Sequence, residues 1–266
     1  MFSPALPLAL LALTASVTAQ GTTGSITTPR CLELMPLAQG KMPVPPNQNS
    51  IVVPASVPSY IGLGIGIQNY TCTGGNYTCV FIFFDWPHSD ERRNRNVGAV
   101  AELFDVSCLI GTPEFSSLQD IGYAAWSQAP TSFAGQGTIQ ALIAALSPYY
   151  ASFVLGQHYF IPAASGSGIT AVWDFRASFP GNDDALVLGS KVGDVPAPTG
   201  PPDVDWLSLN GMPGHDGLAT QIFRVSSVGG LPPAQSCTPG SPEITVKYSS
   251  MYWLFGTSVG PNRPAA

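Results

Sequence analysis

The sequence of 266 residues contains sixteen acidic residues but only ten Lys and Arg, which gives a formal net charge of −6 at pH 7. So few cations exclude a basic patch for nucleic acid or for an anionic lipid surface. Charged residues make up only 10% of the chain, against about 25% in an average soluble protein. The surface must therefore consist mainly of uncharged polar residues and Gly.

Residues 1–19, MFSPALPLALLALTASVTA, predict a secretory signal peptide. The apolar stretch from about Ala5 to Leu13 is too short to span a bilayer, and it leads to a small-x-small cleavage pattern at residues 17–19. No later stretch is apolar over a sufficient length, so no membrane span is expected. We therefore expect a secreted protein, located in the extracellular space or the cell wall.

Residues 20–50 form a Pro-rich lead-in and residues 51–256 a single β-rich domain, with a tail at 257–266. The domain contains eight runs that predict strands, most of them separated by clusters of Gly, Pro, Asn and Asp that are typical of antiparallel turns. These runs are residues 60–72, 98–109, 157–162, 169–176, 185–192, 204–209, 221–227 and 243–255.

The region between the second and third runs departs from this pattern. Phe115, Leu118 and Trp126 lie near helical spacing, and residues 137–153 are rich in Ala and Leu until Pro148 interrupts them. The sequence therefore predicts a mostly β protein, an antiparallel β-sandwich or open barrel, with a helical insertion at about 112–153.

The stretch GLGIGIQ at residues 62–68 has the glycines of a dinucleotide-binding loop but not its spacing. Such a loop has Gly-x-Gly-x-x-Gly between a strand and a helix, whereas here the pattern is Gly-x-Gly-x-Gly and no helix is expected to follow. The alternation of Gly with Leu and Ile instead predicts a strand whose glycine face lies close to another layer. No nucleotide or other cofactor is expected.

The candidates for acid–base catalysis are His158, Tyr159 and Asp174. His158 and Asp174 lie in successive strand runs, so they could form a His–carboxylate pair if adjacent strands bring them together. The alternative is a hydrogen-bonded structural histidine. The acids at residues 183–184, 203 and 205 are typical of turns, and a calcium site built from these loops is the alternative. The spacing of His and Cys does not fit a zinc site, and no metal is expected.

Exposed aromatic side chains could stack on sugar rings, although most aromatic residues of so apolar a chain should lie in its core. The candidates are Trp126, Tyr149, Tyr150, Trp173, Trp206 and Trp253.

Cysteines and sequons also fit an extracellular protein. In an oxidising compartment we expect disulfides, with one cysteine left over. The five cysteines are Cys31, Cys72, Cys79, Cys108 and Cys237. Two Asn-Tyr-Thr sequons, at Asn69 and Asn76, predict N-glycosylation.

Several stretches of the chain form a specific combination. They are IGLGIGIQNYTC, GAVAELFDVSCL, GQHYF, VWDF, VDWLSL, FRVSSVGGLPPAQSC and ITVKYSSMYWLF. From about Pro43 to Gly256 the chain thereby resembles the domain-of-unknown-function 3455 family, secreted proteins of fungi with bacterial relatives. The resemblance implies a secreted, β-rich single domain without an established reaction. A malate dehydrogenase label, which members often carry, is disfavoured because the nucleotide-binding fingerprint is missing.

The resemblance also implies a disulfide between Cys72 and Cys237 and a second between Cys31 and Cys108, which leaves Cys79 over. It further implies a candidate site, to whose residues the family assigns no role. These residues are Gln68, Tyr70, His158, Tyr159, Trp173, Asp174, Lys191, Trp206 and Arg224.

Residues 80–96 depart from the family pattern, in which the chain runs from Asn-Tyr-Thr almost directly into Gly-Ala-Val-Ala. This segment carries six charged residues and the run VFIFF, which is typical of aggregating strands. One hypothesis is a retained intron translated in frame, since every Val codon begins with GT, as introns do. The alternative is a genuine exposed insertion, in which Cys79 stays a thiol or links to a partner.

Three functions remain open. The first is an extracellular or cell-surface binding role for a disulfide-stabilised glycoprotein, with carbohydrate as one candidate ligand. The second is an extracellular enzyme of hydrolase type that uses His158 and Asp174, although no catalytic motif is recognisable. The third is a structural cell-wall or interaction protein without a small ligand.

Overall fold

The computed structural model describes residues 37, 40–79, 82–84, 95–97, 99–129, 154–166, 168–257 and 259. All eight predicted strands are present within a few residues of their expected bounds. They are β1 (Pro58–Thr73), β5 (Ala99–Asp105), β6 (Val154–Pro162), β7 (Ile169–Asp174), β8 (Leu186–Val195), β9 (Trp206–Gly211), β10 (Gln221–Gly229) and β11 (Ile244–Phe255).

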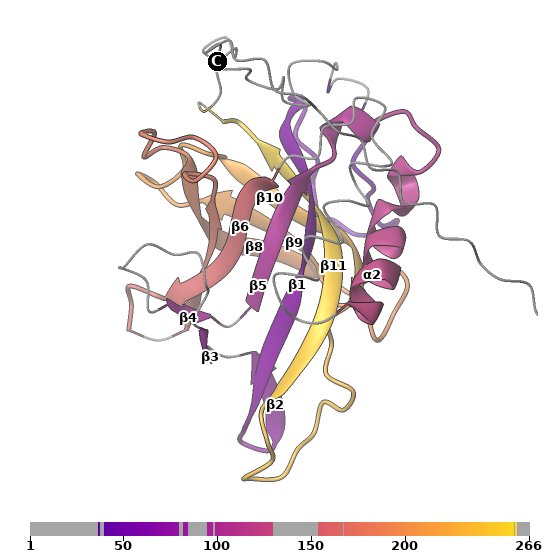
Figure 1. Cartoon of the computed structure of the whole chain (residues 1–266), viewed down its shortest axis with the longest axis vertical. Coiled ribbons are helices and arrows are strands. Elements are labelled where there is room, and N and C mark those ends of the chain that lie inside the picture. Colours follow the sequence, from indigo (N-terminus) through magenta and orange to yellow (C-terminus); the bar gives the residue numbers. More distant parts are fainter. Residues whose placement is uncertain are drawn as a thin grey trace, which may run out of the picture.

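These eight strands form a closed antiparallel barrel, rather than the predicted sandwich or open barrel. Each strand pairs with the next along the chain, and β11 returns to pair with β1 (Figure 1). The long strand β1 closes the barrel because it pairs with β11 over Pro58–Tyr70 and with β5 over Gly62–Gln68. Closure leaves none of the eight strands at an open sheet edge.

The remaining elements are short. β2 (Asn76–Cys79) makes a hairpin with the end of β1 and extends beyond the barrel (Figure 1). β3 (Ile82–Phe84) and β4 (Arg95–Val97) form a separate two-stranded sheet. The 3₁₀ turns η2 (Ser107–Leu109) and η3 (Phe115–Ser117) lead into helix α2 (Leu118–Gln128). The predicted helical insertion is thus confirmed over α2, and residues 130–153 lie outside the described residues.

Helix α2 covers the outer face of β1 and β11 (Figure 1). Its Leu118 and Trp126 pack into a cluster with outward-facing apolar side chains of β1, β10 and β11. The indole Nε1 of Trp126 donates to Gly66 O at 2.8 Å. Lys247 on β11 donates from Nζ to Trp126 O at 2.8 Å, which places a cation at the negative end of the helix dipole.

The barrel interior is filled by the opposite faces of the same strands, because successive residues of a strand alternate sides. Apolar residues from all around the barrel form one interior cluster, with Tyr60, Leu103, Trp173, Leu209 and Tyr252 among its members.

On β1 the interior face carries the predicted glycines. A Cβ at Gly64 would lie 2.5 Å from Tyr252 Cε2, and one at Gly66 would lie 2.0 Å from Val100 O. The glycines therefore make room for the aromatic rings of β11 and for close packing against β5, as the prediction of a glycine face expects.

The two ends of the interior differ in chemistry. At the apolar end, Tyr60 stacks edge-on against Phe175 and Phe179, and its hydroxyl donates to Val259 O at 2.7 Å. Buried Leu218 and Ala219 complete this end. The opposite end, at the close of β1 and β10 and the start of β11, is lined by polar side chains, and we call it the polar end.

The implied disulfide between Cys72 and Cys237 is present and joins the end of β1 to the loop before β11. Cys79 is a thiol. Because Cys31 lies outside the described residues, its pairing with Cys108 stays a prediction.

The glycine face gives a stability prediction. Replacing Gly66 by Ala should lower the free energy of unfolding by about 2 kcal/mol or more, because the new methyl group collides with backbone atoms of β5 that cannot move aside. Gly62→Ala is the matched control on the same face. Its nearest neighbour, at 3.2 Å, is the side-chain atom Leu103 Cδ2, so its cost should stay below about 1 kcal/mol. Equal urea midpoints for the two variants would contradict this packing account.

Candidate functional site

Polar side chains from several strands converge in the interior at the polar end. Gln68 and Tyr70 come from β1, Arg224 from β10 and Tyr248 from β11, and all four are buried. Five of the nine residues implied by the family pattern face the interior: Gln68, Tyr70, His158, Trp173 and Arg224. The sequence missed Tyr248 and Tyr252, although their spacing of four on one strand places them on the same face.

Arg224 is the charged group of this cluster, and its side chain is only 8% exposed. It lies opposite Tyr252 and Leu207 in the strand register. Its Nε and Nη2 donate to the backbone oxygen of Asp205 at 3.1 and 2.8 Å. Within the described part of the chain, no carboxylate lies at ion-pair distance from Arg224. A buried cation whose acceptors are neutral carries an uncompensated desolvation cost.

The groups around Arg224 are neutral at physiological pH. Tyr70 donates to Gly230 O at 2.6 Å, and the hydroxyls of Tyr248 and Tyr252 lie 3.1 Å apart. Burial raises the pKa of all three phenols, and the Arg224 charge only partly opposes this. Burial likewise raises the pKa of the Cys79 thiol to about 11. None of these groups is therefore ionised, and none of them supplies a negative charge to balance Arg224.

His158 is also held neutral. It is 3% exposed, its ring stacks on Trp173 with centroids 4.3 Å apart, and its Nδ1 lies 2.9 Å from Val172 O. Burial lowers the pKa of His158 to about 3, and the nearby Arg224 charge acts in the same direction. The carbonyl partner assigns the proton to Nδ1, so Nε2 is left as an acceptor.

The structure does not bring His158 and Asp174 together. In the register of β6 and β7, His158 pairs with Trp173 and faces the interior, whereas Asp174 pairs with Gln157 on the outer face. There Asp174 accepts from Arg176 Nη2 at 2.8 Å and from Tyr159 OH at 3.0 Å. Burial acts to raise the pKa of Asp174, but the bonds and charge of Arg176 hold it below its ordinary value.

The other candidates lie away from the polar cluster. Lys191 is exposed and pairs with Asp194 on its own strand. Trp206 is buried in the outer cluster beneath α2, together with Trp126 and Trp253. Since Trp173 is buried as well, none of the four tryptophans in the described residues offers an exposed platform for a sugar. Tyr149 and Tyr150 lie outside those residues.

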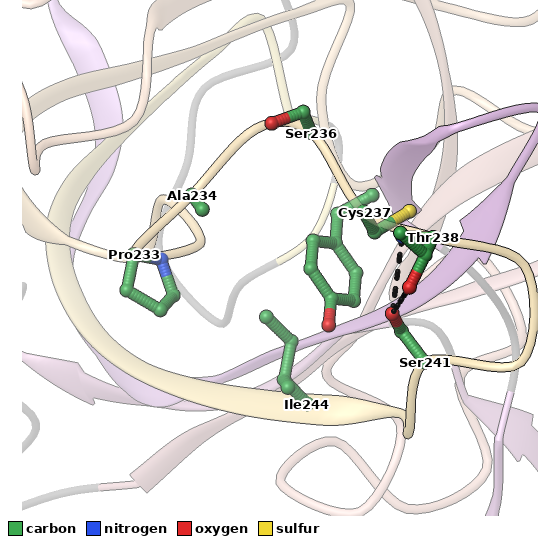
Figure 2. A pocket seen from close by; sticks show the side chains of 8 residues that line it. Pro233, Ala234, Ser236, Cys237, Thr238, Ser241 and Ile244 are labelled. Carbon is green, nitrogen blue, oxygen red and sulfur yellow. Dashed lines mark hydrogen bonds between the residues drawn. The ribbon is translucent and has the colours of Figure 1, made fainter.

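A pocket of about 580 Å³ lies beyond the polar end, between the β1–β2 hairpin and the loop before β11 (Figure 2). We call it the loop pocket; it is lined by Tyr77, Pro233, Ala234, Ser236, Cys237, Thr238, Ser241 and Ile244. Ile244 pairs directly with Tyr70, and Tyr77 pairs with Cys72. By strand alternation both continue the interior face of β1 and β11. The loop pocket therefore lies immediately outside the polar cluster.

The two sequons differ in accessibility. Asn69 is 0% exposed, and its Oδ1 accepts from Thr245 Oγ1 at 2.7 Å. Asn76 is exposed at the start of β2. The folded structure therefore favours a glycan on Asn76 and argues against the predicted one on Asn69.

Among the described residues, no group of three or more His, Cys, Asp or Glu side chains is placed to hold a metal ion. No helix in these residues is long and apolar enough to cross a bilayer.

Comparison with known proteins gives one match. A family model described as a protein of unknown function, DUF3455, matches residues 54–256. No curated protein and no solved structure was found to be similar to the chain.

The buried histidine predicts a pH dependence. In the unfolded chain His158 binds a proton below about pH 6.5, its ordinary pKa, whereas the folded protein binds it only near pH 3. Between these pH values the unfolded state binds more protons than the folded state. Acidification therefore lowers the free energy of unfolding by about 1.4 kcal/mol per pH unit through this group. Urea unfolding of His158→Phe between pH 6.5 and 4.5 should show a correspondingly shallower fall.

His215→Ala is the control for this measurement, because His215 is exposed in the loop between β9 and β10. It should keep the wild-type profile. If His158→Phe keeps it too, His158 takes up a proton in the folded protein and is not neutral as we infer.

The sequons give a matched pair of variants, since Thr71 and Thr78 face each other across the β1–β2 hairpin. Thr78→Ala removes the sequon of the exposed Asn76 and should lower the mass of the secreted protein by one glycan. Thr71→Ala removes the sequon of the buried Asn69 and should leave the mass otherwise unchanged. Intact-mass spectrometry with and without deglycosylation decides, and a glycan on Asn69 would contradict the burial of that residue.

Proposed function

Since the chain belongs to the DUF3455 family of unknown function, as its motifs predicted, we propose its function from the barrel itself. The chain is an extracellular binding domain whose ligand reaches the polar end of the barrel through the loop pocket. The observation that carries this proposal is the convergence of buried polar side chains around Arg224 on the interior face that continues, along β1 and β11, to that pocket.

The difference between the two ends supports a binding role. A barrel interior that served stability alone would gain from apolar residues at both ends, because buried polar groups add little or cost free energy. The apolar end follows this rule in its aromatic cluster, where Tyr60 contacts Phe175 and Phe179, although buried Asp105, opposite Gly62 on the interior face, lies near this end as well. The polar end instead holds a guanidinium, an amide and phenols, which are the groups that orient a ligand.

An extracellular site of action is supported by two features. The Cys72–Cys237 disulfide lies at the wall of the loop pocket, and disulfides persist in oxidising compartments. The predicted signal peptide at residues 1–19 agrees with it.

The hydrolase alternative is less well supported. His158 and Asp174 face opposite sides of the sheet. A histidine whose pKa is about 3 is a poor general base at neutral pH. The structural alternative, a cell-wall protein without a small ligand, accounts for the bonds of Arg224 to Asp205 O but not for the use of a buried charge to make them. Carbohydrate stays a candidate ligand, because the phenols and the amide of Gln68 could bind sugar hydroxyls.

Blocking the loop pocket tests this proposal. Ala234 is exposed and lines the pocket, so Ala234→Trp should fill it and weaken binding. Ala177→Trp, at an exposed position of the loop after β7 near the apolar end, is the matched control. The probes are a glycan array and a thermal-shift panel of small metabolites, each with the secreted, disulfide-bonded chain.

We expect at least one class of wild-type ligand whose binding Ala234→Trp removes and Ala177→Trp retains. A wild-type chain that binds nothing on either panel would favour the structural alternative. Equal sensitivity of binding to both variants would place the ligand elsewhere.

A further inference from the structure

We propose that the polar end of the barrel binds a carboxylate group of its ligand and that Arg224 is the residue that holds it. This inference rests on the proposed binding function and names the chemistry of the ligand.

The charge of the site comes from Arg224. Arg224 is buried, and its neighbours on every adjoining strand are neutral or apolar: Gln68, Tyr70, Cys79, His158, Leu207, Tyr248 and Tyr252. Asp205, the residue directly before β9, accepts from Arg224 through its backbone oxygen. The residue itself is exposed. The Asp205 carboxylate lies close enough to act on the Tyr70 phenol, but among the described residues no ion pair joins it to Arg224, so the positive charge is left for a ligand to balance.

The site has more hydrogen-bond donors than acceptors. A guanidinium has five N–H donors in a planar fork. Its acceptor among the described residues is Asp205 O, which takes two of these bonds. Nearby, the indole Nε1 of Trp173 has no acceptor among the described residues, and the ring lies beside Tyr252 with centroids 6.0 Å apart. Donors therefore exceed acceptors here, which favours a ligand rich in acceptors.

A carboxylate fits this site better than a phosphate group does. A carboxylate carries one negative charge and accepts two parallel hydrogen bonds from one Arg fork. A phosphate group carries about −1.5 to −2 at pH 7, which a single buried cation would leave unbalanced. The site therefore matches a carboxylate in both charge and shape.

The ligand approaches Arg224 from the side of the loop pocket. Tyr70 lies between the loop pocket and Arg224, because it pairs with the pocket residue Ile244 and its hydroxyl donates to Gly230 O. The Arg224 charge reaches this phenol, since it acts to lower the pKa that burial has raised. On this proposal, a ligand in the loop pocket extends its carboxylate to the guanidinium once the buried Tyr70 side chain moves aside.

Titration calorimetry at pH 7 tests the inference with five probes: acetate, acetamide, glucuronate, glucose and inorganic phosphate. Acetate should bind more tightly than its neutral analogue acetamide, and glucuronate more tightly than glucose, by about tenfold or more, the usual worth of a charged hydrogen bond. Binding of acetate and glucuronate alike indicates a carboxylate recognised by itself. Binding of glucuronate alone indicates a carboxylate presented on a sugar.

Two arginine variants form a crossed control. Arg224→Met should weaken carboxylate binding by about tenfold or more and should not lower the melting temperature, because it removes a buried charge without a carboxylate partner. Arg176→Met removes the partner of Asp174 on the outer face, so it should lower the melting temperature and keep the binding. Arg224→Lys keeps the charge but loses the fork, and should bind carboxylates more weakly than wild type.

The outcomes are distinguishable. If glucose binds as tightly as glucuronate and Ala234→Trp removes both, the proposed function stands and the carboxylate inference is wrong. Tighter binding of phosphate than of either carboxylate, or carboxylate binding that Arg224→Met does not change, also overturns it. If Arg224→Met fails to fold, the comparison of acetate with acetamide on the wild-type chain still decides.

Discussion

The interior face of β1 is the constraint on which the barrel depends. Glycines at 62, 64 and 66 leave this face without side chains, and the aromatic ring of Tyr252 occupies the space beside Gly64. The same strand pairs along both edges, with β11 and with β5, and so closes the sheet. Larger residues here would push β5 and β11 away from β1 and reopen the barrel. The outward side chains of β1 pack against α2, so this strand contributes to both the outer and the interior hydrophobic cluster.

Beyond the glycines, β1 continues with Gln68 and Tyr70 on the same interior face. The change from Gly to polar side chains marks the boundary between the packed interior and the polar end. Arg224 lies at this boundary and donates to a backbone oxygen rather than to a carboxylate. A buried charge of this kind is a cost to folding, and a ligand that supplies the missing negative charge would offset it.

Much of the fold could be predicted from the sequence, since β-branched runs between Gly/Pro turns located all eight strands and α2 followed helical spacing. Closure could not be predicted, because residue alternation assigns the faces of a strand but not its partners. For the same reason His158 and Asp174 looked like a pair: their offset of one position in the β6–β7 register puts them on opposite faces. Arg224, a lone cation within an apolar strand run, was the stronger signal of a site.

The central claim is that the negative charge of a ligand balances Arg224. Its most direct test is a crystal structure of the secreted chain grown with glucuronate. The account predicts carboxylate oxygens at about 2.7–2.9 Å from the guanidinium nitrogens of Arg224, with the sugar extending into the loop pocket. An Arg224 that is instead paired with a carboxylate of the chain itself, with no ligand at the polar end, would contradict it.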